Sequence, residues 1–249
     1  MIAKKADLRG LQRCGRIAAF TLHELARNIR PGVTTSELNL IAERLIKARG
    51  ATPSFKNYQN YPSALCVSIN DEIVHGLPGQ RKIKLGDLVG LDIGVNLEGY
   101  FTDCATTVSV GRPSKATQSL LLGVKEALSE TIKAVKAGGH VGDLESKCGE
   151  ILKTYQLKPI LALSGHGTGS AVHEPPAIKS AGKAGEGAKI VGGMVLAIEP
   201  MATLGCGRVK TAKDGWTVKT VDGKLAAHFE HTIIVTPFCA KILTLQGPH

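Results

Sequence analysis

The stretch GDLVGLD (residues 86–92) has the length and apolar content of a buried strand, but it ends in a carboxylate, Asp92. With one residue inserted in the alignment of the two halves, it falls on GMVLAIE (residues 193–199), which ends in the carboxylate Glu199. An ionised carboxylate buried without a partner costs several kcal/mol or takes up a proton. The two stretches therefore predict equivalent strands in two related halves, each delivering a carboxylate that requires a cation.

An internal repeat extends outward from these two stretches. Residues 29–38 align without gaps with residues 135–144, although identity is low and the repeat is weak evidence when taken alone. Each half reads as two helices followed by strands. We therefore predict an α+β fold in which a single domain, residues 1–249, has pseudo-two-fold halves of about 1–112 and 113–249. A dinuclear metal site is expected between the halves.

Periodicity and turn residues set the remaining elements. Apolar residues at helical spacing predict helices at residues 8–29, 34–46, 115–137 and 143–155. Strands are predicted at residues 63–69, 85–110, 160–163, 194–201, 216–220 and 228–236. Gly99 lies in a polar connection within the second of these segments, which indicates a hairpin. The segment 179–193 is rich in Gly and Lys and is expected to be a surface loop.

Five side chains form a candidate metal-binding set: Asp92, Asp103, His166, Glu199 and Glu230. Asp92 and Asp103 lie on either side of the expected hairpin. Glu199 is held extended by the proline that follows it, and Glu230 precedes an apolar strand. Four carboxylates and one imidazole suit a pair of divalent ions better than a single structural zinc ion. Because a two-metal site activates water and clamps a carbonyl or phosphoryl oxygen, the set predicts a dinuclear metallohydrolase.

Taken singly, several of these residues have plainer interpretations. Asp103 alone is better explained as an acid that caps a turn or pairs with a surface base, and His166 alone as a residue of a Gly-rich loop. His173 follows His166 by seven positions, and two histidines beside a Pro-Pro segment indicate one ligand and one second catalytic group. His75 alone is best explained as a turn histidine between strands.

A group of aromatic and sulfur side chains precedes the candidate catalytic residues. Tyr58, Tyr61 and Cys66 come before His75, and Trp216 comes before the last carboxylate. These side chains either line an apolar substrate pocket or belong to the ordinary core. For Phe55, in the same region, we expect the core.

Composition narrows the class of protein. Of the 249 residues, 43% are hydrophobic, which is enough for a sizeable core and excludes a disordered chain. No apolar stretch approaches membrane-spanning length, the first residues lack the apolar run of a signal peptide, and none of the six cysteines forms a CxxC pair. We therefore expect a cytoplasmic protein with reduced thiols and no membrane partner. The net charge of +10 indicates either an acidic partner such as ribosomal RNA or a basic surface with no specific partner.

Five separated motifs, in matching order and spacing, give the chain a family resemblance. They are CVSIN (66–70) through HGLP (75–78), Asp92 with Asp103, GHG (165–167) through HEP (173–175), IEPM (198–201), and DGWT (214–217) through FEHT (229–232). Together they resemble the type 1 methionine aminopeptidases of the pita-bread metalloprotease fold, over nearly the whole chain. The resemblance implies removal of the N-terminal methionine from nascent polypeptides when the second residue is small.

The resemblance also implies a role for each metal ligand. Asp103 and Glu230 would bridge two divalent ions, which could be Fe, Mn, Co or Zn. Asp92 would chelate one ion, and His166 with Glu199 would complete the other. A water between the ions would attack the first peptide bond, and Glu199 would take its proton.

Further residues match the family's substrate site. His173 would stabilise the scissile carbonyl or the oxyanion, and His75 would contact the amide that is cleaved. The residues that match the family's methionine pocket and substrate contacts are Tyr58, Tyr61, Cys66, His75, His173 and Trp216. As partners we expect the N-termini of nascent chains and a contact with the ribosome surface, and we expect a monomer.

Three departures from the family pattern and two alternative functions accompany the resemblance. Val172 stands where an aromatic residue is frequent, Phe55 where a small residue is frequent, and Pro175-Pro176 replaces a more acidic stretch. A proline-specific aminopeptidase or dipeptidase would share all five ligands but carry an extra N-terminal domain, whereas a helix is expected here within ten residues of Met1. A non-enzymatic module that binds RNA or protein would have lost ligands, and this chain keeps them all.

Overall fold

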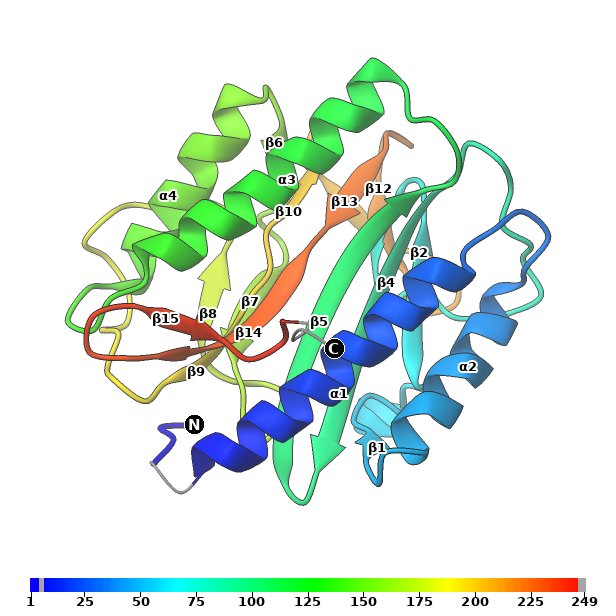
Figure 1. The fold of residues 1–249 in the computed structure, drawn as a ribbon. Helices are drawn as coiled ribbons and strands as arrows, with labels where there is room; N and C mark the ends of the chain where they lie inside the picture. Colours follow the sequence, from blue (N-terminus) through cyan, green and yellow to red (C-terminus); the bar gives the residue numbers. More distant parts are fainter. Residues whose placement is uncertain (5–6, 246–249) are drawn as a thin grey trace.

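The computed structural model describes residues 1–4 and 7–245. Over these residues the chain forms four α-helices: α1 (Asp7–Asn28), α2 (Thr35–Lys47), α3 (Lys115–Ala134) and α4 (Val141–Thr154). A short 3-10 helix, η1, covers Tyr58–Asn60. Figure 1 shows the helices in two pairs over one face of a curved sheet, with α1 and α2 covering one half and α3 and α4 the other. The predicted sequence of two helices followed by strands therefore occurs twice.

The largest sheet within the described ranges has nine strands, in the order β1-β4-β5-β14-β9-β7-β8, with β2 also paired to β4 and β15 to β14. These strands are β1 (Thr52–Pro53), β2 (Leu65–Ile69), β4 (Leu88–Leu97), β5 (Tyr100–Ser109), β7 (Ser164–Gly167), β8 (Glu174–Lys179), β9 (Val195–Ile198), β14 (Glu230–Val235) and β15 (Ala240–Ile242). Strand β14 lies between β5 and β9, so it joins the two halves at the centre.

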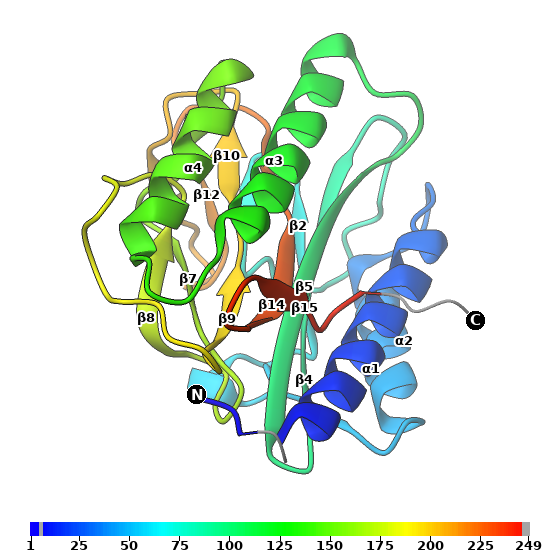
Figure 2. The ribbon, with the colours of Figure 1, turned by 60° about the vertical axis from the view of Figure 1, so that its left-hand side comes forward.

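Two smaller sheets flank the main one. They are formed by β13-β10-β6 and by β11-β12-β3. Their strands are β3 (Glu72–Val74), β6 (Lys158–Pro159), β10 (Met201–Thr203), β11 (Val209–Thr211), β12 (Val218–Thr220) and β13 (Ala226–His228). Figure 2 shows α3 and α4 standing beside this part of the molecule, away from α1 and α2.

Two of the apolar clusters among the described residues lie beneath the helix pairs, one in each half. One core lies between α1, α2 and the strands β2, β4 and β5, and it includes Leu25, Leu38 and Leu91. The other packs α3 and α4 on β9 and β14, through residues such as Leu144 and Ile233. The helix starts follow the sequence: Thr34 forms a capping box at α2 and Ser114 caps α3. Because the helices bury one face of the sheet, the other face is left for the site.

One sequence expectation about strands was wrong, and several short strands, β8 among them, were not expected. Residues 160–163 do not form a strand but a turn between β6 and β7, where Leu161 is half exposed and Ala162 and Leu163 line a cavity. Strand β8 was not expected, because its Pro175-Pro176 pair lacks backbone N–H groups. It lies at the end of the sheet order, and an edge strand does not need both sets of hydrogen bonds.

None of the helices in the described ranges is long and apolar enough to cross a membrane.

Candidate metal centre and substrate pocket

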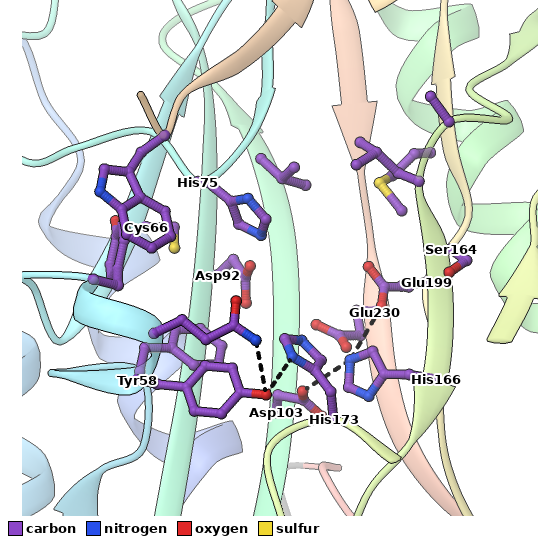
Figure 3. Close-up of a pocket in the computed structure, with 18 residues that line it drawn as sticks. Tyr58, Cys66, His75, Asp92, Asp103, Ser164, His166, His173, Glu199 and Glu230 are labelled. Carbon is purple, nitrogen blue, oxygen red and sulfur yellow. Dashed lines mark hydrogen bonds and ion pairs between the residues drawn. The ribbon is translucent and has the colours of Figure 1, made fainter. Parts of the chain in front are cut away.

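A cavity of about 370 Å³ opens on the face of the sheet opposite to the helices, and every residue predicted for the site lines it. Figure 3 shows the carboxylates and histidines converging there, with Asp92 and Asp103 on one side and His166 and Glu199 on the other. The remaining members are Tyr58, Tyr61, Cys66, His75, His173, Trp216 and Glu230. Residues distant in sequence are thus gathered from both halves.

Strand register places three carboxylates on one face. Asp92 on β4 pairs with Ala105 on β5, and Ala105 pairs in turn with Glu230 on β14. Asp103 lies two residues before Ala105, so it points to the same side of the sheet. The small side chain of Ala105 leaves the space between the three carboxylates open. The expected hairpin between the first two acids is therefore confirmed.

The second half supplies His166 and Glu199. His166 lies within β7 and not in a loop, which corrects the expectation from its glycine-rich surroundings. The flanking glycines are required by close packing of backbones: a Cβ at Gly165 would lie 2.5 Å from the carbonyl oxygen of Ala197, and one at Gly167 would lie 2.2 Å from that of Pro175. Glu199 follows β9 directly, beside this strand.

Distances within the cluster fit shared metal ions. The Nε2 atom of His166 lies 3.4 Å from Oδ2 of Asp103 and 3.4 Å from Oε1 of Glu199. Ligand atoms of Asp103, His166 and Glu230 all lie within 4.8 Å of one another. Two ligands that each lie about 2.1 Å from one ion are separated by roughly 3.0–3.4 Å, because their directions diverge by 90–110°.

The tautomer of His166 agrees with a ligand role. Its Nδ1 atom lies 2.9 Å from the carbonyl oxygen of Gly167, which can only accept, so Nδ1 carries the hydrogen. In the neutral form of the ring, the lone pair of Nε2 then faces two carboxylate oxygens. Such an arrangement is repulsive unless a cation lies between these atoms.

The electrostatics of the buried acids also call for cations. Burial, the largest cause, raises the pKa of Asp92 to about 7 and that of Glu199 to about 8. Burial and the neighbouring carboxylates also raise the pKa of Glu230 well above its ordinary value. Within the described ranges, Oδ1 of Asp92 is buried without a hydrogen-bond partner. The donor set of hard oxygens and one imidazole therefore fits divalent metal ions.

We expect the stabilisation by metal to increase with pH. In the metal-free protein, Asp92 and Glu199 keep protons up to pH 7–8, whereas the unfolded chain loses them near 3.8 and 4.5. The free energy of unfolding of the metal-free form therefore falls as pH rises from about 4 to 7–8, and it levels off above that range. Mn²⁺ competes with these protons, so it binds better at high pH. Thermal unfolding at pH 5–8.5, with and without Mn²⁺, measures the difference, and a difference independent of pH would contradict this account.

His173 lies at the mouth of the cavity, next to the metal cluster. Its ring meets that of His166 edge-to-face, with 4.3 Å between centroids, and its Nδ1 lies 3.2 Å from the hydroxyl of Tyr58. Desolvation of its ring, followed by repulsion from His166 and His75, lowers the pKa of His173 to about 4. The imidazole is therefore neutral at pH 7. Backbone N–H groups of Ser170 and Ala171 donate to Glu174 and hold the preceding loop.

His75 stands on the opposite wall and is held in a strained backbone conformation. Its φ is +57°, a left-handed value that is unusual for a residue other than glycine. A Cβ on the next residue, Gly76, would lie 2.1 Å from the carbonyl oxygen of Val67, so only glycine allows this close approach to β2. His75 lines the cavity, so it is not simply the turn residue that its sequence position indicated when taken alone.

An apolar compartment adjoins the acids. Tyr61 and Trp216 meet edge-to-face at 5.1 Å between centroids, and Cys66 is buried beside them. The hydroxyl of Tyr61 lies 3.1 Å from the carbonyl oxygens of Leu65 and Gly76, so its polar end faces away from the cavity's centre. A thioether side chain suits such a lining of aromatic rings and sulfur.

Phe55 was expected in the core, and that expectation was wrong. Phe55 is half-buried and lines the cavity. Its ring packs on Gly94, where an added Cβ would lie 2.4 Å from the ring. Val172, another departure from the family pattern, is buried. Phe55 thus contributes an aromatic wall from the first half.

Two residues near the metal cluster were not found from the sequence. Thr232 on β14 donates from its hydroxyl to Oδ1 of Asp103 at 2.9 Å and accepts from the backbone N–H of Asp103 at the same distance. His228 on β13 lies 3.3 Å from Oε2 of Glu199. The sequence signal for His228 was its position two residues before Glu230. Within the predicted strand 228–236, alternate residues were expected to share a face.

The fold and the site define a metal-dependent hydrolase built from two related halves, with acids from both halves around one cluster. The family model described as "Metallopeptidase family M24" matches residues 9–237, and the chain belongs to this family. The chain is therefore a metallopeptidase, and the use of divalent metal follows from its family and its ligand cluster.

Individual relatives share nearly the full length of the chain. It is 44% identical over 234 residues to methionine aminopeptidase 1 of Bacillus subtilis, covering 94% of each sequence. A crystal structure of a methionine aminopeptidase from Thermotoga maritima matches with a TM-score of 0.96 and 38% identity, over 98% of both chains. A prolidase from Pyrococcus furiosus matches with a TM-score of 0.80 and 25% identity, over 99% of this chain and 66% of that one. The expected pita-bread fold and the resemblance to methionine aminopeptidases are confirmed.

Proposed function

We propose that this protein removes the N-terminal methionine from peptides and nascent proteins whose second residue is small. One observation carries the proposal: the metal cluster opens directly onto a small compartment of aromatic rings and a thiol. The compartment can accept one thioether side chain while the adjoining peptide bond lies over the acids. Relatives over 94% of the chain are named methionine aminopeptidases, which supports the same activity.

The proposed roles follow from the positions of the side chains. Asp103 and Glu230 would hold two divalent ions, Asp92 would bind one of them, and His166 with Glu199 would bind the other. When bound, the ions supply Lewis acidity and lower the pKa of a water molecule. Glu199 would be the carboxylate placed to accept the proton of that water.

Two neutral histidines complete the site. Nδ1 of His173 lies 3.2 Å from the hydroxyl of Tyr58. We assign the hydroxyl as the donor, which leaves the hydrogen of the imidazole on Nε2, where it can be donated to the scissile carbonyl oxygen. His75 on the opposite wall contacts the amide nitrogen that departs. Burial keeps the pKa of His75 below its ordinary value, so it is neutral as well.

Peptide hydrolysis tests this function. Met-Ala-Ser and Met-Gly-Ser should be cleaved well, Leu-Ala-Ser poorly because a branched side chain loses the compartment's fit, and Met-Ile-Ala hardly at all because a bulky second residue clashes beside the metals. A chelator should abolish cleavage, and Mn²⁺ or Co²⁺ should restore it. Cleavage of Ala-Pro with no cleavage of Met-Ala-Ser would instead indicate a proline-specific peptidase.

We also propose that the chain is a single domain, residues 1–249, with halves near 1–112 and 113–249. In the cell we propose a monomer in the cytoplasm that docks on the ribosome. A basic hairpin, residues 208–224, supports docking. It contains Trp216, which lines the cavity, so the positive charge of the hairpin lies near the site that would receive the nascent chain. Its basic residues are Arg208, Lys210, Lys213, Lys219 and Lys224. Among the described residues, Lys219 alone of these five forms an ion pair, with Asp71 at 2.8 Å.

Ribosome binding should weaken when this hairpin is neutralised. Lys210→Glu with Lys213→Glu is expected to reduce co-sedimentation with ribosomes by about tenfold or more at low salt, because phosphate contacts release counterions. Hydrolysis of a free tripeptide should not change. The matched control, Lys147→Glu with Lys153→Glu on α4, alters the net charge equally and should bind as the parent does. Equal binding by both double variants, or binding that is insensitive to salt, would refute docking by the hairpin.

A further inference from the structure

His228 is a buried histidine behind the cavity that none of the proposed roles uses. It is 4% exposed, at the end of β13, where it pairs in register with Met201 of β10. Its backbone is fixed from the neighbouring strand: the hydroxyl of Thr107 donates to the carbonyl oxygen of His228 at 2.7 Å and accepts from its N–H at 3.0 Å. The imidazole therefore has a defined place in the fold.

The Nε2 atom of this ring is directed at the metal cluster. Within the described part of the chain it has no hydrogen-bond partner, although it is buried. It lies 3.3 Å from Oε2 of Glu199, while Oε1 of the same carboxylate lies 3.4 Å from Nε2 of His166. Glu199 is thus placed between two imidazoles, one on each oxygen.

The two imidazoles cannot have the same task. Nδ1 of His166 donates to a carbonyl oxygen, so its Nε2 presents a lone pair to a cation shared with Oε1. Oε2 is left on the far side, where a buried carboxylate oxygen requires a donor. Nε2 of His228 is the nitrogen within reach of it.

We propose that His228 is a positioning residue that donates from Nε2 to Oε2 of Glu199 and fixes this carboxylate with Oε1 toward the metal. The hydrogen bond forms when the carboxylate is ionised, which is the form that a metal ion selects. Hydrogen bonds to a ligating carboxylate orient it, and their loss typically costs about 10–100-fold in metal affinity or activity. The inference rests on the proposed metal-binding role of Glu199.

Two substitutions separate donation from packing. His228→Leu removes the donor and puts an apolar side chain of similar size in its place. Because it also removes a buried unpaired polar atom, the metal-free variant should fold at least as well. His228→Gln keeps an N–H donor the same number of bonds from the backbone. His231→Leu is the matched control, because His231 lies on β14 one residue after Glu230 and pairs with Thr244 at 3.0 Å.

The readout is calorimetric titration of the metal-free proteins with Mn²⁺, together with kcat and KM for Met-Ala-Ser. For His228→Leu we expect about 10–100-fold weaker binding of one ion and a comparable loss of kcat, with KM changed by less than about threefold. His228→Gln and His231→Leu should bind Mn²⁺ within about threefold of the parent. Restoration by Gln distinguishes donation from a purely structural role.

The outcomes that overturn the proposal are distinct. If His228→Leu binds Mn²⁺ as the parent does, or if His228→Gln loses as much affinity as His228→Leu, His228 does not position Glu199. If His228→Leu fails to fold, loss of metal affinity in His228→Gln overturns the proposal by itself. If the parent protein binds no metal, the proposed function fails first, which separates the two failures.

Discussion

Glu230→Ala should abolish peptide hydrolysis, with a loss of at least about 10³-fold in kcat. Glu230 lies at the centre of the cluster, on the strand that joins the two halves, with its carboxylate within 4.8 Å of ligand atoms of Asp103 and His166. In the proposed arrangement two ions share this carboxylate, so its removal would weaken both sites. The remaining buried acids then lie near one another with less cation charge to offset their repulsion.

The measurement is metal content after dialysis together with kcat for Met-Ala-Ser. The expected result is that neither ion is retained at stoichiometric level and that added Mn²⁺ does not restore the rate. Glu126→Ala is a suitable control, because Glu126 accepts a hydrogen bond from Tyr155 on the helical side of the protein, away from the cavity. If Glu230→Ala is as active as Glu126→Ala, Glu230 does not bridge two metal ions.

His173→Ala should lower kcat by about 10²–10³-fold while metal content stays at the parent level. The loss of one donor to a developing oxyanion typically has this size. His173 stands beside the ligand His166 but outside the ligand cluster, and its neutral ring can donate a hydrogen bond without carrying charge. The effect should therefore be on turnover and not on metal binding.

A comparison of two histidine substitutions checks this assignment. His23→Ala changes an exposed histidine on α1 and should leave both rate and metal content unaltered. If His173→Ala instead loses metal in proportion to rate, His173 is a ligand and the proposed assignment of roles is wrong. If His173→Ala retains full activity, His173 does not donate a hydrogen bond to the scissile carbonyl oxygen.

Much of the candidate site could be predicted from the sequence alone. Carboxylates inside apolar strands have few compatible explanations, because an unpaired buried charge is so costly. That constraint is local, so Asp92 and Glu199 could be identified from their neighbours in the chain. The low-identity repeat then indicated two halves.

The tertiary structure decided what depends on register and on contacts between distant strands. Asp103 and His75 had plainer interpretations when taken alone, and only the pairing of β4, β5 and β14 shows that Asp103 faces Asp92 and Glu230. Phe55 belongs to the cavity wall because Gly94, on another strand, leaves room for its ring.

The same reason explains why Thr232 and His228 were missed. Thr232 contacts Asp103 across 129 positions of sequence. His228 meets Glu199 only because β13 pairs with β10, where His228 lies opposite Met201, two residues after Glu199. Residue type and spacing report what a segment needs from its environment, such as a cation for a buried acid. They do not report which distant side chain meets that need, because that depends on strand order and register, which the whole chain fixes together.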